Sequence, residues 1–286
     1  MTKANVVILA GQSNAVGCSY VEYLSGLFPA ETISGWREGY EKIKINYFSH
    51  DIKSGGFVKT SFNCSVSDED TFGPEVGIAD ALNERYPEKE FFIVKCAFGG
   101  VTLARDFLSP SGVGNYDPLA YADQKENIND FCRPGESVRA GWAYNELVKI
   151  ISESLSALQS RGYRPEIKAL CWMQGESDAN SEEATLNYEK NYGAFLSDIK
   201  AAFFPFMKDC LFIDAGVSRV WERYERMNEI KRRFAESHGG CAFIDTIAAG
   251  LDTMKEPHEQ PDIGHYDAES MIKLGRTFAE NITNIK

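Results

Sequence analysis

Residues 6–17 read VVILAGQSNAVG, an apolar run that passes directly into a polar turn bounded by glycines. An uninterrupted run of β-branched and aliphatic residues is typical of a strand that is buried on both faces, as in a parallel sheet. In such a sheet the loop after the strand's carboxyl end faces the crevice where ligands bind. The stretch therefore predicts a first buried strand, and it places Ser13 at the ligand-binding edge of an α/β sheet.

The rest of the sequence alternates short apolar runs with longer segments of helical period. The further predicted strands are Phe91–Phe98, Ile167–Met173, Leu211–Val217 and Ala242–Ile247, and the predicted helices span 75–86, 142–161, 182–204, 219–237 and 268–284. Asp267 is the expected N-cap of the last helix. Strand and helix in alternation indicate an α/β fold with about five parallel strands and helices on both faces of the sheet.

Two stretches depart from this alternation. Residues 30–72 are predicted to be a long loop that includes a hairpin around Lys42–Phe48 and Gly56–Phe62, and residues 108–138 form a second long loop rich in Gly, Pro, Asn and Asp. Long loops in compact domains are often functional, so the second is a candidate wall of a substrate site. No repeat or linker divides the sequence, which predicts one domain over residues 1–286.

Composition excludes several classes of partner. The 286 residues carry a net charge of −12, which disfavours nucleic acid and anionic lipid surfaces. No apolar run approaches the roughly 20 residues that span a bilayer. The N-terminus shows no export signal and favours a cytoplasmic protein, whereas a secreted protein would follow if a signal peptide had been removed. The seven cysteines lie far apart without a CxxC pair, which predicts reduced thiols and no metal site or cofactor.

Two short segments carry candidates for nucleophilic catalysis. Ser13 follows the first strand and is either a nucleophile or a cap of the next helix. Asp262 precedes His265 by three residues through a glycine-containing turn, a step that lets a carboxylate orient an imidazole for base catalysis. An ordinary surface histidine near a helix start has the same local pattern, so neither segment is decisive alone.

Two further segments offer hydrogen-bond donors for a developing oxyanion. Gln174 follows an apolar strand, where a polar amide is costly unless it is used. Gly100 follows the strand 91–98, and a glycine there allows an unhindered backbone N–H to approach a ligand. All four segments fall at the carboxyl ends of predicted strands or at the matching edge, where one fold brings them together.

Five blocks of the sequence recur in this order in one group of hydrolases. They are GQSN at 11–14, GPE at 73–75, Gly99-Gly100, WMQGESD at 172–178 and Asp262-x-x-His265-Tyr266. With them the chain resembles the SGNH hydrolase superfamily, and within it the sialate O-acetylesterase and carbohydrate esterase family 6 group. The resemblance implies a flavodoxin-like, three-layer α/β/α domain and a serine esterase that removes O-acetyl groups from carbohydrate, such as acetylxylan or a sialic acid.

The resemblance also assigns roles to residues. It implies Ser13 as the nucleophile, His265 as the base and Asp262 as its orienter. The Ser13 N–H, the Gly100 N–H and the Gln174 amide are implied to hold the oxyanion. Gln12, Asn14 and Glu176 are implied to support these groups by hydrogen bonds. Two positions depart from the family's pattern: Ala15 stands where Met is common, and Val101 separates the glycine pair from Thr102.

Three other interpretations remain open at this point. Gly175-Glu176-Ser177-Asp178-Ala179 approaches a nucleophile elbow with Ser177 as the attacking residue, although Ala179 replaces its final glycine. A protein that binds carbohydrate without catalysis would keep the crevice and lose the triad, whose residue types are all present. A metal-dependent deacetylase lacks ligands of familiar spacing. Aromatic residues in the loops either stack on sugar rings or fill gaps: Trp36, Tyr47, Tyr116 and Tyr121.

Overall fold

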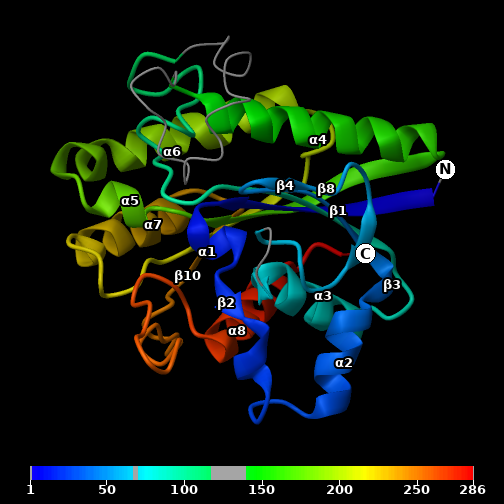
Figure 1. The fold of residues 1–286 in the computed structure, drawn as a ribbon. Coiled ribbons are helices and arrows are strands. Elements are labelled where there is room, and N and C mark those ends of the chain that lie inside the picture. The colour runs from blue at the N-terminus through cyan, green and yellow to red at the C-terminus, as the bar shows by residue number, and fades with distance from the viewer. Residues whose placement is uncertain (1, 67–69, 117–139, 286) are drawn as a thin grey trace.

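A mostly parallel sheet forms the centre of the computed structural model, which describes residues 2–66, 70–116 and 140–285 (Figure 1). Within these residues the strand order is β10-β9-β8-β1-β7-β3, all parallel, and β4 and β5 pair antiparallel with β3 at the edge. The strands of this sheet are β1 (Thr2–Gly11), β3 (Tyr40–Ser49), β4 (Ile52–Lys53), β5 (Val58–Thr60), β7 (Phe91–Ala97), β8 (Tyr163–Met173), β9 (Leu211–Ala215) and β10 (Cys241–Ile244).

Helices cover both faces of the sheet, as predicted (Figure 1). The helices and the small second sheet are α1 (Ser13–Val16), β2 (Ser19–Tyr20), the 3-10 helix η1 (Val21–Leu24), α2 (Ala30–Glu38), β6 (Thr71–Phe72), α3 (Pro74–Arg85), α4 (Trp142–Ser160), α5 (Glu176–Ala179), α6 (Glu182–Ala202), α7 (Tyr224–Ser237) and α8 (Ala268–Glu280). One apolar core lies under α4, α6 and α7, and the other lies against α2, α3 and α8.

Alternate side chains of β1 point to opposite faces of the sheet and so contribute to both cores. Val6 and Ile8 point into the first core, and Val7 and Leu9 point into the second. All four side chains are fully buried. A strand between two apolar layers needs an unbroken hydrophobic run, which is why residues 6–10 could be recognised from sequence.

The predicted fold class is confirmed, and β3 adds a sixth parallel strand to the five expected. β3 pairs with β5 as the expected hairpin and also runs parallel to β7 on its other side. Only some of its residues are buried, so its sequence lacks the continuous apolar run of the inner strands. The predicted loop 30–72 therefore also contains α2, β3, β4, β5 and β6.

The start of one helix also differs from the prediction. Helix α7 begins at Tyr224, not at residue 219, because the backbone N–H of Arg223 donates to Ala179 O and holds the preceding turn against α5. The second long loop, 108–138, lies outside the described residues from 117 onward.

The carboxyl ends of the three central strands are level with one another. Gly11 at the end of β1 pairs with Ala97 of β7 on one side and with Met173 of β8 on the other. From β1 the chain builds outward first through β3 and β7 and then through β8, so the strand order reverses at β1. Such a switch point is where open α/β sheets bind ligands.

Two glycines let α3 and α8 pack backbone to backbone beneath the sheet. A Cβ at Gly77 would lie 2.2 Å from Ile272 O, and one at Gly275 would lie 2.1 Å from Pro74 O. The helices therefore approach more closely than any side chain would allow. This contact holds α8, and with it the turn that precedes α8, against the sheet.

Replacing Gly275 by alanine should destabilise the protein, because the added methyl group must push two helix backbones apart. We expect a loss of about 1–3 kcal/mol in the free energy of unfolding, measured by urea denaturation. Gly35 in α2 is the matched control, since a Cβ there meets nothing within 4 Å. Gly35→Ala should stabilise the protein by up to about 1 kcal/mol. Effects of the same sign in the two variants would contradict this account.

Candidate active site

The opening turn is built on the close approach of β1 and β8. Gly11 has φ +147°, and a Cβ there would lie 1.9 Å from Met173 O. The Gln12 backbone N–H donates to the same oxygen at 2.8 Å. Ser13 follows as the first residue of α1 and is 9% exposed. The turn therefore sets Ser13 at the carboxyl edge of the sheet, as predicted.

The closing turn holds Asp262 against His265. His265 Nδ1 lies 2.5 Å from Asp262 Oδ2, and the Gly264 N–H donates to Asp262 Oδ1 at 3.2 Å. The His265 backbone N–H donates to Asp262 O at 3.1 Å. The carboxylate thus fixes both the imidazole and the turn that carries it, the geometry expected of an orienting aspartate.

The start of α8 supports this turn in an unexpected way. Asp267 is the N-cap residue, but its carboxylate accepts from the backbone N–H groups of Lys255 and Glu256. Glu256 Oε2 takes over the capping of the helix by accepting from Ala268 N at 2.7 Å. The sequence pattern identified the cap position, although the capping side chain comes from the preceding loop.

Asn14 joins the opening turn to the closing turn. Its Nδ2 donates to Gly264 O at 3.2 Å, and its Oδ1 accepts from the Tyr266 N–H at 3.0 Å. The same Nδ2 donates to Glu176 Oε1 at 3.0 Å. Asn14 follows Ser13, and Gly264 and Tyr266 flank His265, so these bonds bring the segments of the two candidate catalytic residues together.

The charge state of His265 depends on two neighbours. Burial lowers the pKa of the imidazole, but the Cys18 side chain and the Asp262 carboxylate raise it, and the net shift is upward. The hydrogen bond from His265 in turn lowers the pKa of Asp262. Cys18 was not singled out from the sequence, because a lone cysteine in a polar turn carries no pattern.

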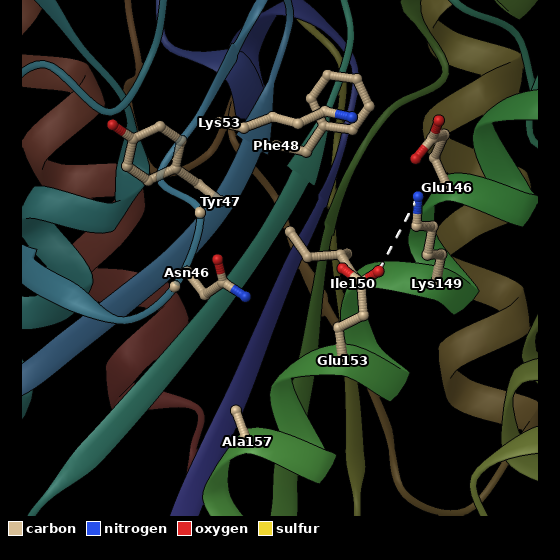
Figure 2. A pocket seen from close by; sticks show the side chains of 11 residues that line it. Asn46, Tyr47, Phe48, Lys53, Glu146, Lys149, Ile150, Glu153 and Ala157 are labelled. Carbon is tan, nitrogen blue, oxygen red and sulfur yellow. Dashed lines mark ion pairs between the residues drawn. The ribbon is translucent and has the colours of Figure 1, made fainter.

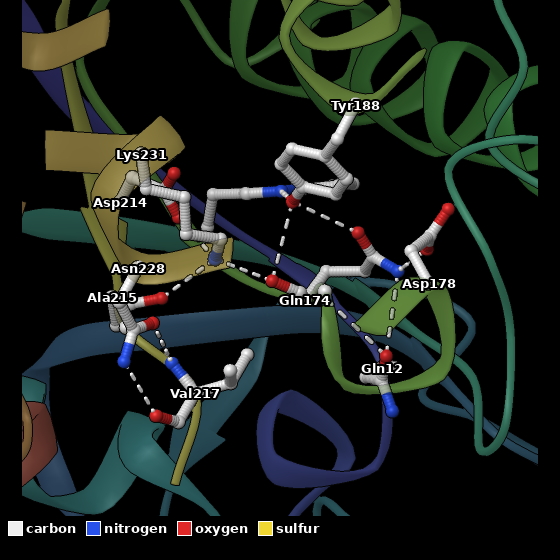
Figure 3. Close-up of polar contacts among 12 residues, drawn as sticks. Gln12, Gln174, Asp178, Tyr188, Asp214, Ala215, Val217, Asn228 and Lys231 are labelled. Carbon is white, nitrogen blue, oxygen red and sulfur yellow. Dashed lines mark hydrogen bonds and ion pairs between the residues drawn. The ribbon is translucent and has the colours of Figure 1, made fainter. Parts of the chain in front are cut away.

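Gln174 is not arranged as the sequence predicted. Its Nε2 donates to Asp178 Oδ2 at 2.6 Å and to Val101 O at 3.2 Å. Its Oε1 accepts from the Tyr188 hydroxyl at 3.0 Å (Figure 3). The side chain is fully buried. Because acceptors inside the protein take both amide hydrogens, the structure does not present this amide to the crevice. Gln174 holds neighbouring segments in place.

Asp178 fixes the loop after β7. Its carboxylate accepts from Leu103 N at 2.8 Å, from Ala104 N at 3.0 Å and from Gln174. Burial raises the pKa of Asp178 to about 6, although these hydrogen bonds lower it. The loop that carries Gly100 is thus tied to the segment after β8. The Ser177 hydroxyl points the other way and accepts from Gln12 Nε2 at 3.4 Å.

A buried lysine holds the segment after β8 from below. Lys231 Nζ donates to Gln174 O at 2.5 Å and to Ala215 O at 2.7 Å, and it pairs with Asp214 Oδ1 at 2.8 Å (Figure 3). Burial raises the pKa of Asp214 to about 6, against the opposing effect of Lys231. One ammonium therefore links the ends of β8 and β9.

A second buried lysine, also missed from sequence, holds α1. Lys95 Nζ donates to Val16 O at 2.7 Å and to Cys64 O at 2.8 Å, and it pairs with Glu75 Oε2 at 2.8 Å. Both side chains are fully buried. The available signal was a lysine inside the apolar run FFIVKCAF, since a charged residue in a buried strand requires a partner.

The loop aromatics do not form a common stacking surface. Trp36 is buried and donates to Asp80 Oδ1, so it fills the space between α2 and α3. Tyr116 donates to Asn145 Oδ1 and packs on Tyr144. Tyr47 lines the cavity described next, and Tyr121 lies outside the described residues.

A cavity of about 270 Å³ lies between α4 and the edge of the sheet (Figure 2). Lys53 covers the ring of Phe48 at 3.7 Å, and Lys149 pairs with Glu153 at 3.9 Å. None of the predicted catalytic residues lines it. The catalytic candidates therefore lie elsewhere, at the end of β1.

The described residues contain no group of three or more His, Cys, Asp or Glu side chains placed to hold a metal ion. No helix among them combines the length and apolarity that crossing a bilayer requires. The six cysteines among them are free, and Cys132 lies outside. A mechanism without metal or cofactor stays a prediction.

Solved structures show the same fold. A protein from Arabidopsis thaliana is 16% identical, with a TM-score of 0.65 and coverage of 99% of this chain and 98% of that one. NanS is 18% identical, with a TM-score of 0.64 and the same coverages. A carbohydrate acetylesterase from Xanthomonas citri is 13% identical, with a TM-score of 0.56 and coverage of 96% of this chain and 55% of that one. No curated protein matches the sequence.

The fold is a three-layer α/β/α sandwich, and the candidate site lies at the carboxyl edge of its sheet. Residues 3–284 match the model of one family, described as carbohydrate esterase, sialic acid-specific acetylesterase. The chain therefore belongs to this family. This assignment makes it a carbohydrate esterase, as the sequence motifs predicted.

Removing the carboxylate of Glu75 should be costly, because it leaves the Lys95 ammonium buried without its opposite charge. We expect Glu75→Ala to reduce the free energy of unfolding by about 3–5 kcal/mol, measured by urea denaturation. The control is Glu88→Ala, which breaks the exposed pair of Lys42 and Glu88 and should leave stability unchanged within error. Equal losses in the two variants would refute the anchoring role of Lys95.

Proposed function

We propose that this chain removes O-acetyl groups from carbohydrate with Ser13 as the nucleophile, His265 as the base and Asp262 as its orienter. The observation that carries the proposal is the pair of hydrogen bonds from Asn14 to Gly264 and Tyr266. They join the turn of a serine to the turn of a histidine that is already held by a carboxylate. This is the order of groups that activates a hydroxyl for acyl transfer.

The reaction is a two-step acyl transfer. The Ser13 hydroxyl oxygen attacks the acetyl carbonyl carbon while His265 takes the hydroxyl proton. The tetrahedral intermediate collapses, His265 returns the proton to the departing sugar oxygen, and an acetyl-enzyme remains. Water then attacks the acetyl group by the same route and releases acetate. Asp262 holds the imidazole in the required tautomer and stabilises the imidazolium that forms in each step.

Two backbone N–H groups are the proposed donors for the oxyanion. Neither Ser13 N–H nor Gly100 N–H donates to a backbone acceptor within the described part of the chain. Gly100 has φ +69° and lies on the loop after β7, beside the end of β1. Donors fixed by the backbone need no reorganisation when charge develops, which is the basis of their effect on rate.

The rival nucleophile, Ser177, lacks comparable support. Its hydroxyl and its backbone N–H both face the Gln12 side chain, at 3.4 and 3.1 Å. The carboxylate of the neighbouring Asp178 is bound to Gln174 and to two backbone N–H groups. The contacts of Ser177 thus support a structural role in the segment after β8.

Mutation distinguishes the roles of Ser13 and Ser177. Ser13→Ala should abolish acetate release from p-nitrophenyl acetate and from acetylated xylan, acetylated sialic acid and acetylated hexoses. The loss should be about 10³-fold or more, because the reaction loses its nucleophile. Ser177→Ala, the matched control, should retain activity within about tenfold. Loss of activity in Ser177→Ala alone would refute the assignment, and the preferred substrate of the panel would identify the sugar.

The raised pKa of His265 sets the pH dependence. Only the neutral imidazole accepts the Ser13 proton, so activity should fall as pH drops through the pKa of His265. Because that pKa is raised from 6.5, we expect the acid limb of kcat/KM to lie above pH 6.5. Asp262→Asn should lower that pH and reduce kcat by about 10⁴-fold.

Asp209→Asn serves as the control for this profile. Asp209 is exposed and lies just before β9, at the opposite edge of the sheet from the site. Its replacement should leave both the rate and the profile unchanged. An acid limb of the parent enzyme below pH 6.5 would contradict the environment assigned to His265.

A further inference from the structure

The loop after β7, which carries the Gly100 N–H, is held at both of its ends by one tryptophan. Phe98, the residue before the two glycines, donates through its backbone N–H to Gly11 O at 3.2 Å. The centroid of its ring lies 4.6 Å from the ring centroid of Trp142, the first residue of α4. At the far end of the loop, the indole Nε1–H of Trp142 donates to Asp106 Oδ1 at 2.8 Å. Trp142 therefore contacts the loop both before and after Gly100.

Asp106 closes the far end of this loop into a turn. Its Oδ2 accepts from the Thr102 N–H at 2.7 Å and from the Thr102 hydroxyl at 3.0 Å. Its backbone N–H donates to Thr102 O at 3.0 Å, and its carbonyl oxygen accepts from Ala143 N at 2.9 Å at the start of α4. The residue is 4% exposed. One buried aspartate thus binds the turn to itself and to α4.

Two buried carboxylates take three successive backbone N–H groups of the loop, those of residues 102–104. Asp106 accepts the first, and Asp178 accepts the second and third. By contrast, the N–H of Gly100 donates to no backbone acceptor among the described residues. The carboxylates therefore fix the backbone next to Gly100 and leave its N–H for a ligand at the edge of the sheet.

We propose that Asp106 is a positioning residue that holds the Gly100 N–H at the place where the oxyanion forms. The proposal rests on the esterase function proposed above. A carboxylate suits this role because its two oxygens accept three hydrogen bonds here, whereas a carboxamide has one accepting oxygen and two donor hydrogens. A donor that is fixed before the reaction stabilises the oxyanion without reorganisation. None of the family's sequence blocks discussed above includes Asp106.

Asp106→Asn tests the proposal, because an NH2 group then faces either the Thr102 N–H or the indole N–H of Trp142. We expect kcat and kcat/KM for p-nitrophenyl acetate to fall together by about 10–100-fold with KM unchanged, since the oxyanion exists only in the transition state and the intermediate. The matched control is Asp198→Asn. Asp198 also accepts from a backbone N–H and a hydroxyl, those of Ser111, but at an exposed site. Its replacement should change neither constant, and a folded Asp106→Asn with the parent's kcat overturns the proposal.

Two variants of Thr102 decide the question if Asp106→Asn does not fold. Thr102→Val removes only the hydroxyl bond to Asp106, and it should lower kcat by about threefold to tenfold, the value of one hydrogen bond. Thr102→Ser keeps the hydroxyl and should restore the rate of the parent. Equal values of kcat in the two variants overturn the proposal.

Hydrogen exchange of the backbone amides, followed by mass spectrometry, gives a readout that does not require activity. Exchange in residues 99–107 should be faster in Asp106→Asn than in the parent and in Asp198→Asn, while exchange in β1 stays unchanged. An unchanged rate in this loop, or an equal increase in the loop and in β1, overturns the proposal even if no acetyl ester is hydrolysed. Absence of hydrolysis by the parent would instead refute the proposed function.

Discussion

The hydrogen bonds of the Asn14 side chain are the constraint on which the site depends. They connect Asn14 with Glu176, 162 positions further along the sequence, and with Tyr266, 252 positions further along, and they also hold Gly264. A carboxamide offers two donors and an acceptor in one plane, whereas a carboxylate could not donate to Glu176 or to Gly264 O. The sheet brings three loops to one edge, and the hydrogen bonds of Asn14 fix the positions of these loops relative to one another.

Two buried ion pairs give that edge a rigid base. Lys95 with Glu75 lies on the face covered by α3 and α8, and Lys231 with Asp214 lies on the face covered by α7. A buried ion pair is poor evidence for stability, since desolvation offsets most of the attraction. Each lysine here also binds backbone carbonyls at the carboxyl edge of the sheet. We interpret both pairs as contacts that fix the positions of the loops at this edge.

The sequence predicted those parts of the molecule that are set by hydrophobic pattern. Strands between two apolar layers must be continuous apolar runs, so β1, β7 and β8 were recognisable. β3 was recognised only as part of a hairpin, because an outer strand need not be apolar throughout. Family motifs located Ser13 and His265, but the direction of a side chain such as Gln174 depends on acceptors such as Val101 O, which is 73 residues away. No local pattern encodes such a partner.

The helix that carries Ser13 shows that the position of this serine depends on tertiary contacts. α1 has only four residues, far fewer than an isolated helix needs for stability. It persists because its ends are bound elsewhere: Gln12 N to β8, Val16 O to Lys95, and the Asn14 side chain to the closing turn. The proposed nucleophile is thus held by three elements that are distant in sequence. A serine in the same tetrapeptide without them would have neither the geometry nor the partner for catalysis.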